Sequence, residues 1–293
     1  MSKKFLSFTV AAGLGFTALT ILGSCGSGGG NKPTNIDSAT SDSKKLDSLT
    51  KEKKNKIAFK FATAETNMPS PFEVVNDVSA FQTDCKKDLL NDYTKADSYV
   101  SSFKKAVNMG IYGIDLAYVN CYGQNQEMLH YFTTIQKLSK ELSFEKVFDE
   151  YSERFKSNSG NKDSVAQLAD AVFASTDDYL KKNEKLLVSS QIMAGALIEI
   201  NYLSINLLKD VKKTPENSAA FEKVYNENAV LYHLSDLFKE LTSDKDSKDL
   251  LAKLDAYRTS FDGIIKSAND MTPENLAKAA QLVTDLRKGL TQK

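Results

Sequence analysis

The segment LLVSSQIMAGALIEINYLSINLL, residues 186–208, decides the fold of this chain because it is long, apolar and carries a single charge, Glu199. A helix that is apolar on most of its faces has to be covered by neighbours on those faces. The segment approaches the length of a membrane span, but Gln191, Asn201 and Asn206 make it too polar for a lipid-exposed helix. It therefore predicts the central helix of a helical bundle.

Small residues indicate where another helix approaches this segment closely. The Ala-Gly-Ala sequence at 194–196 has little side-chain volume, so a neighbouring backbone can come near. A second segment, NMGIYGIDLAYVNCYGQNQE at 108–127, has Gly110 and Gly113 within an apolar, tyrosine-rich run. We expect these two glycines to be joints where short helices turn or pack closely.

Helical patterns separated by short polar breaks fill the chain from residue 71 onward. Proline is absent from residues 72–211, and no sustained alternation of apolar and polar residues indicates a strand. The chain is therefore expected to be all-α, a multi-helix bundle or irregular helical array of about nine or ten helices without a sheet. We predict helices near residues 71–91, 95–109, 111–123, 125–141, 144–157, 163–183, 185–212, 215–242, 246–267 and 273–290.

Four short segments carry signals for the start of a helix. SPFE at 70–73 and SVAQ at 164–167 have the pattern of capping boxes. TPEN occurs at 214–217 and at 272–275, each time with Thr as the N-cap, Pro in the first turn and an acid after it. The residues after the two TPEN copies share only a helical period, so we interpret them as independent helix starts.

The first 24 residues have the pattern of a secretory signal peptide, because Lys3 and Lys4 precede an apolar run from Phe5 to Leu22. The run ends in LGSC at 22–25, which resembles the lipobox of bacterial lipoproteins. That resemblance implies that Cys25 is lipidated and becomes the first residue of the mature chain. The alternative is an uncleaved transmembrane anchor, but the small residues before the cysteine favour the signal peptide.

Residues 25–56 are rich in glycine, serine and lysine and almost lack apolar side chains, so we predict a flexible tether followed by a single helical domain at 57–293. The full sequence has 38 basic and 38 acidic residues, and removal of Lys3 and Lys4 with the signal leaves 36 against 38. Such a balanced surface argues against nucleic acid as a partner, because binding phosphates requires a basic footprint.

Two carboxylates in apolar surroundings are the candidates for a functional site. Asp115, Tyr118 and Tyr122 share one stripe of a helix, and Glu199 shares a face with Tyr202 on another. A buried carboxylate has to be paired or keep its proton. One interpretation is a shared pocket with tyrosine hydroxyls as orienting groups.

The other interpretation of these carboxylates is structural, and we favour it. In that case a tyrosine hydroxyl, a lysine or one of the three arginines, Arg154, Arg258 and Arg287, binds each carboxylate. From local sequence order we expect Arg154 to be the partner of Asp115.

No motif in the sequence predicts catalysis, a cofactor or a metal. Glu127 and His130 form a Glu-x-x-His pair, but a di-iron site needs two such pairs, and no Glu lies three residues before His233. We therefore predict no catalytic residue, no metal and no cofactor, and an enzyme is disfavoured. Cys85 and Cys121 lie in helix-like sequence, and we expect unpaired thiols rather than a disulfide.

Four further segments carry a resemblance to a family: PSPFE at 69–73, YGIDLAY at 112–118, NKDS at 161–164 and ALIE at 196–199. With these segments the chain resembles an uncharacterised family of all-helical bacterial lipoproteins, over roughly Met68 to Leu207. The resemblance implies an envelope lipoprotein without catalytic residues to carry over.

Together these observations predict a lipid-anchored cell-envelope protein that faces the periplasm. Gly26 after the cysteine gives no acidic retention signal, which favours the outer membrane. The expected function is a non-enzymatic helical binding or scaffold module for an envelope protein or peptide. The alternative is a small-ligand or enzymatic pocket built around Asp115 and Glu199.

Overall fold

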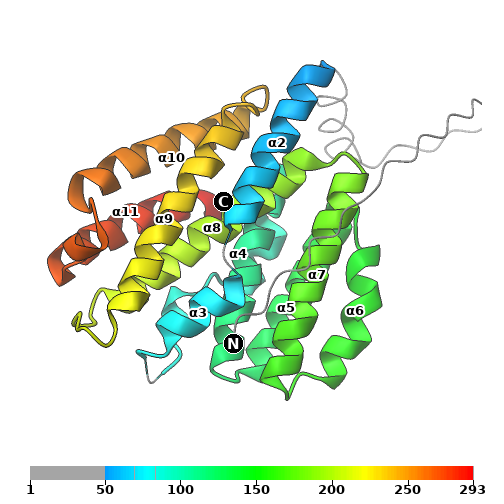
Figure 1. Ribbon diagram of the computed structural model, residues 1–293. Helices are drawn as coiled ribbons and strands as arrows, with labels where there is room; N and C mark the ends of the chain where they lie inside the picture. The colour runs from blue at the N-terminus through cyan, green and yellow to red at the C-terminus, as the bar shows by residue number, and fades with distance from the viewer. Residues whose placement is uncertain (1–49, 69, 83, 293) are drawn as a thin grey trace, which may run out of the picture. The chain divides into compact units, whose positions relative to one another are not determined.

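The computed structural model describes residues 50–68, 70–82 and 84–292. These residues form ten α-helices and three short 3-10 helices, and no strand is present among them (Figure 1). The predicted fold class, an all-α array of about ten helices, is confirmed. The predicted signal peptide, the lipidated Cys25 and most of the tether lie outside the described residues.

The helices follow one another through short connections. Their bounds are α2 (Lys51–Asn67), α3 (Pro71–Ser79), η1 (Lys87–Leu89), η2 (Tyr93–Ser98), α4 (Ser102–Cys121), α5 (Asn125–Glu141), α6 (Lys146–Ser157), α7 (Lys162–Lys182), α8 (Leu186–Leu208), α9 (Ser218–Phe238), α10 (Lys245–Ile264), η3 (Ala268–Asp270) and α11 (Pro273–Thr291).

The central helix is α8, as residues 186–208 predicted. All but three of its 23 residues are buried. It is long and apolar enough to cross a membrane, and 83% of its apolar window is covered by other parts of the protein. Full coverage by neighbouring helices explains why it lacks a polar face.

Two glycines allow α4 to pack directly on α8. A Cβ atom added to Gly195 would lie 1.9 Å from the Val107 carbonyl oxygen, and one added to Gly110 would lie 2.0 Å from the Ile192 carbonyl oxygen. Each helix therefore places a glycine against the backbone of the other. The close contact expected at 194–196 is present.

The break expected at Gly110, between helices at 95–109 and 111–123, is wrong because α4 runs unbroken from Ser102 to Cys121, whereas the close packing expected at Gly110 and Gly113 is present. A glycine inside a helix costs about 1 kcal/mol relative to alanine. Here the close contact with α8 at Gly110 and the ring of Phe173 against Gly113 use the missing side chains. Tertiary packing thus overrides the weak local signal for a break.

Two apolar cores lie on opposite faces of α4. One core contains residues of α4 together with α2, α3 and α8–α11, and the other contains residues of α4 together with α5, α6 and α7. In Figure 1 the green helices α5–α7 and the yellow to red helices α9–α11 lie on different sides of α4. This position explains why nearly every residue of α4 is buried.

Helix α2 begins inside the segment that was expected to be a flexible tether. The side chain of Thr50 caps its first turn, and Lys60 forms a salt bridge of 2.7 Å to Glu240, just after α9. Its buried face consists of three residues at helical spacing, Ile57, Phe61 and Ala64. The tether prediction therefore extends at least six residues too far, because the lysine-rich first turns of α2 contain no apolar residue before Ile57.

The region from Ala80 to Val100 is less helical than predicted. The helix expected at 71–91 ends at Ser79, and the chain then passes through the short η1 and η2 before α4 starts. Hydrogen bonds of the buried Asn91 replace helical hydrogen bonds in this region. Apolar periodicity alone does not reveal such contacts.

The predicted helix starts are only partly correct. Thr272 caps α11, with its side chain accepting from the Asn275 amide, and Pro273 follows. Ser70 precedes α3 but makes no side-chain cap, so the capping box is absent. The cap of α7 is Asn161 rather than Ser164. The first TPEN segment forms a turn, and α9 begins at Ser218.

Candidate functional site

Asp115 and Glu199 lie together in the interior of the protein. Asp115 is on α4 and Glu199 is on α8, the two helices that the glycine contacts bring close. Both side chains are fully buried, and the charge of Glu199 acts on the carboxyl group of Asp115. The tertiary fold thus brings two acids 84 positions apart in the sequence into one cluster, which also contains an arginine.

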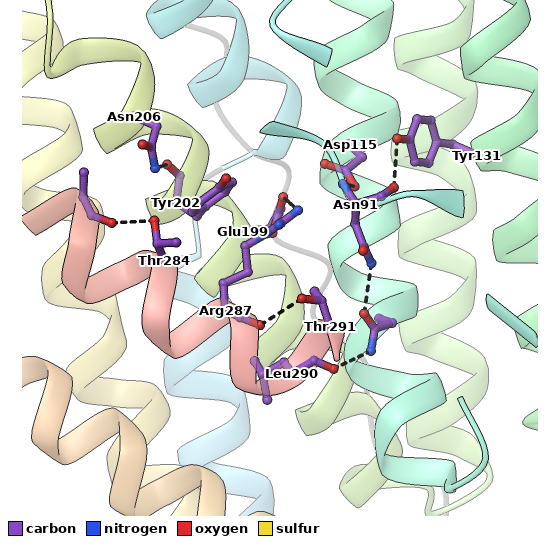
Figure 2. A network of polar contacts seen from close by, with 12 residues as sticks. Asn91, Asp115, Tyr131, Glu199, Tyr202, Asn206, Thr284, Arg287, Leu290 and Thr291 are labelled. Carbon is purple, nitrogen blue, oxygen red and sulfur yellow. Dashed lines mark hydrogen bonds and ion pairs between the residues drawn. The ribbon is translucent and has the colours of Figure 1, made fainter. Parts of the chain in front are cut away.

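Arg287 on α11 binds Glu199 with both ends of its guanidinium group. Its Nε lies 2.5 Å from Glu199 Oε2, and one terminal nitrogen lies 2.7 Å from Oε1. The guanidinium carbon is 4.2 Å from the centre of the Tyr202 ring (Figure 2). Burial alone lowers the pKa of Arg287, but the Glu199 carboxylate outweighs burial and raises it. Glu199 and Arg287 therefore form a buried, bidentate ion pair.

The surroundings of Asp115 favour the protonated form of its carboxyl group. Burial raises the pKa of its carboxyl group well above the ordinary value, and the negative charge of Glu199 raises it further, while Arg287 opposes the shift. Its Oδ2 accepts from the Asn91 amide at 3.1 Å. The other oxygen, Oδ1, has no hydrogen-bond partner among the described residues. The cluster thus places two acids and one arginine together in the core.

Asn91 connects this cluster to the region between α3 and α4. Besides donating its amide to Asp115, it donates its side-chain nitrogen to the Tyr99 hydroxyl at 3.2 Å and to Asn108 Oδ1 at 3.1 Å. Its carbonyl accepts from the Tyr131 hydroxyl at 3.0 Å, and Figure 2 shows Asn91 between Asp115 and Tyr131. One asparagine therefore fixes an irregular segment in the core.

The same network holds the end of α11. Asn108 donates to the Leu290 carbonyl at 3.1 Å. The Lys104 ammonium donates to the carbonyls of Gly289, Leu290 and Gln292 at 3.0, 3.1 and 2.8 Å. These carbonyls lack helical partners at a C-terminus, and a cation is favoured there by the helix dipole. Arg287 is thus carried on a helix whose end is fixed to α4.

Tyr118 and Tyr122 lie apart from the charged cluster. The Tyr118 hydroxyl accepts from the Lys86 amide at 2.9 Å, and the Tyr122 hydroxyl donates to the Ser79 carbonyl at 3.3 Å. The two rings pack edge to face with centroids 5.2 Å apart. Of the tyrosines expected near the carboxylates, Tyr202 alone contacts the cluster, through Arg287.

The expectation that Arg154 pairs with Asp115 is wrong. Arg154 is on α6, where its guanidinium carbon lies 5.7 Å from the centre of the Tyr151 ring. The arginine that balances the buried acids is Arg287, which is 172 positions from Asp115 in the sequence. Proximity in the sequence was the only basis for choosing Arg154, and it carries no information about helix packing.

Two hollows are found in the described part of the chain. A void of about 10 Å³ lies among apolar residues of α4–α7, and a surface cleft of about 120 Å³ lies between α4, α10 and α11. Neither is lined by Asp115 or Glu199. No group of three potential metal ligands exists among the described residues. Glu127 forms a salt bridge to Lys87, and His130 stacks on Tyr93.

Both cysteines in the described part of the chain, Cys85 and Cys121, are unpaired and half-buried. Burial raises the pKa of both thiols, to about 11 in Cys121. A raised thiol pKa disfavours the thiolate, which is the nucleophilic form of cysteine.

Comparison of the chain with family models, with curated proteins and with solved structures gives no match. The class of protein is therefore defined by its fold alone, an all-α helical array with a buried ionic network. The resemblance to an uncharacterised lipoprotein family remains a prediction from the sequence.

Proposed function

We propose that the protein is a lipid-anchored component of a bacterial cell envelope and that its helical domain is a non-enzymatic binding or scaffold module. The proposed cellular location rests on the signal-like residues 1–24 and on Cys25 in the LGSC sequence. In this proposal lipidated Cys25 attaches the chain to the outer membrane, with the domain in the periplasm and nucleic acid excluded as a partner.

The burial of the two carboxyl groups and their contacts within the protein support a binding or scaffold role. Asp115 and Glu199 are fully buried, and Asn91 and Arg287 bind them. A catalytic or ligand-binding carboxylate needs contact with a substrate, and here neither cleft reaches the acids. The network is suited to holding α4, α8 and α11 in one arrangement, which a rigid docking surface requires.

The surface cleft beside α10 is the partner-binding site that we propose. Lys253 and Asp249 are exposed there, beside the half-buried Asp246, and Phe103 and Leu250 supply apolar surface. Charges of both signs around an apolar floor suit a peptide segment that also carries both charges. The pocket around Asp115 and Glu199 is the less supported alternative.

The proposed membrane anchor is tested by mass spectrometry of the N-terminal peptide and by fractionation of cells into membrane and soluble parts. The expected result is diacylglyceryl on Cys25 and loss of membrane association in Cys25→Ala. A chain that starts with an unmodified residue or stays in the membrane after this substitution would exclude the anchor.

The docking site is tested with a photoreactive residue at Lys253 in intact envelopes, with the same residue at exposed Glu150 on α6 as the matched control. A discrete adduct from position 253 that disappears in Asp249→Lys supports the proposal. Equal labelling from both positions, or none from position 253, contradicts it.

A further inference from the structure

Glu227 on α9 is a buried carboxyl group without a hydrogen-bond partner in the described structure. Its side chain belongs to a residue that is 4% exposed, and neither carboxyl oxygen has a donor or acceptor within reach. The protonated acid is much easier to bury than the carboxylate. Burial accordingly raises the pKa of Glu227 to about 8.

The natural partner of Glu227 is bound elsewhere. Lys223 lies one helical turn earlier on α9, at a spacing where side chains meet. Its ammonium instead donates to Glu73 Oε1 at 2.7 Å and to Asp77 Oδ2 at 2.6 Å, both on α3. Lys223 therefore ties α9 to α3 and leaves Glu227 unpaired.

The charges around Glu227 all come from this small group. Lys223 lowers the pKa of Glu227, whereas Asp77 and Glu73 raise it. Helices α2, α8 and α10 also pack against α9, and in the described part of the chain none of the charged groups that act on Glu227 belongs to them. Glu227 therefore competes with Glu73 and Asp77 for the ammonium group of Lys223.

We propose that Lys223 is a two-position switch, with its ammonium on Glu73 and Asp77 while Glu227 is protonated, and on Glu227 once that group has released its proton to solvent. No other bond forms or breaks. The unpaired buried anion would draw the ammonium because Lys223 is the cation whose charge acts on Glu227 in the described part of the chain. The switch does not depend on the proposed anchor or partner.

Movement of the lysine would loosen the first turns of α3. Glu73 and Asp77 then lose the cation between them, and two like charges one turn apart repel each other. The C-terminal end of α3 stays attached through the Tyr122 hydroxyl on the Ser79 carbonyl. The helix would therefore pivot about that end, and the packing of its buried valines would change.

Methyl NMR of the intact protein tests the switch. Three buried valines of α3 report on it: Val74, Val75 and Val78. Their resonances should move between pH 6.5 and 9.5 with one midpoint near 8 in the wild type. The Glu227→Gln variant should show no such transition, because the amide is similar in shape and does not ionise. Glu222→Gln, an exposed acid on the same helix, is the matched control and should retain it.

Two independent measurements complete the test. The carboxyl carbon of Glu227 should titrate with the same midpoint as the valine methyls, and Lys223→Met should give the high-pH spectrum of α3 at every pH. The switch is refuted if the wild-type methyls do not move, if they move alike in Glu227→Gln, or if Glu227 is already ionised at pH 6.

Discussion

Replacing Arg287 by methionine tests the buried ionic cluster most directly. Methionine retains much of the apolar stem but removes the cation, so Glu199 loses both of its short hydrogen bonds in a fully buried place. Breaking a buried pair by removing one partner costs about 3–5 kcal/mol. The lost contact of the guanidinium with the Tyr202 ring adds roughly 0.5–2 kcal/mol.

A loss of that size is a large part of the total stability of a typical domain, which is about 5–15 kcal/mol. The assay is urea unfolding at pH 7, with the midpoint read at constant slope. The matched control is Arg154→Met, where an exposed cation–π contact should be worth about 1 kcal/mol or less.

A second variant separates the ion pair from simple loss of packing. Glu199→Gln combined with Arg287→Met removes both charges, so the double variant should be more stable than Arg287→Met alone. The reasoning is refuted if Arg287→Met costs under about 1 kcal/mol, since a buried, unpaired carboxylate cannot be that well tolerated.

Three further predictions concern the same region. In the wild type, protonated Asp115 stabilises the fold below the ordinary carboxyl pKa, and this stability is lost as pH rises through its raised folded-state pKa. Asp115→Asn should therefore weaken the fall of the urea midpoint with rising pH between pH 4 and 9. An unchanged pH dependence of the midpoint would contradict this prediction. Gly195→Ala should cost about 1–3 kcal/mol in the same assay because its Cβ would overlap the Val107 carbonyl, whereas Gly263→Ala, with open space around it, should be neutral or stabilising by roughly 0.5–1 kcal/mol. Lys104→Met should increase the rate of amide hydrogen exchange at the C-terminal end of α11 by at least about tenfold, which corresponds to about 1.4 kcal/mol. Equal exchange rates in both proteins would show that the ammonium does not hold this end.

The composition of the helices was sufficient to predict the fold class and the place of α8. Its apolar residues on all faces require neighbours on all faces, and the structure supplies them. The small residues at 194–196 likewise indicated a close contact, although not that the partner would be the glycine-containing helix α4.

The site was predictable only in part. The apolar surroundings of Asp115 and Glu199 marked them as buried acids, which they are. Arg287 was one of three candidate arginines, and nothing in its own helix distinguishes it from Arg154. Asn91 gave no signal at all, because an asparagine that satisfies a buried segment looks like any loop residue until its partners are known.

The sequence by itself therefore determined the helical class, the central helix and the need of each buried acid for a proton or a partner, since these follow from local periodicity and the energy of burying charge. Only the tertiary structure decided that α4 continues through its glycines and that the chain between α3 and α4 is held by Asn91. It also decided that Asp115, Glu199 and Arg287 meet. These outcomes depend on which helix faces pack against each other, and residues far apart in the chain carry no local record of that choice.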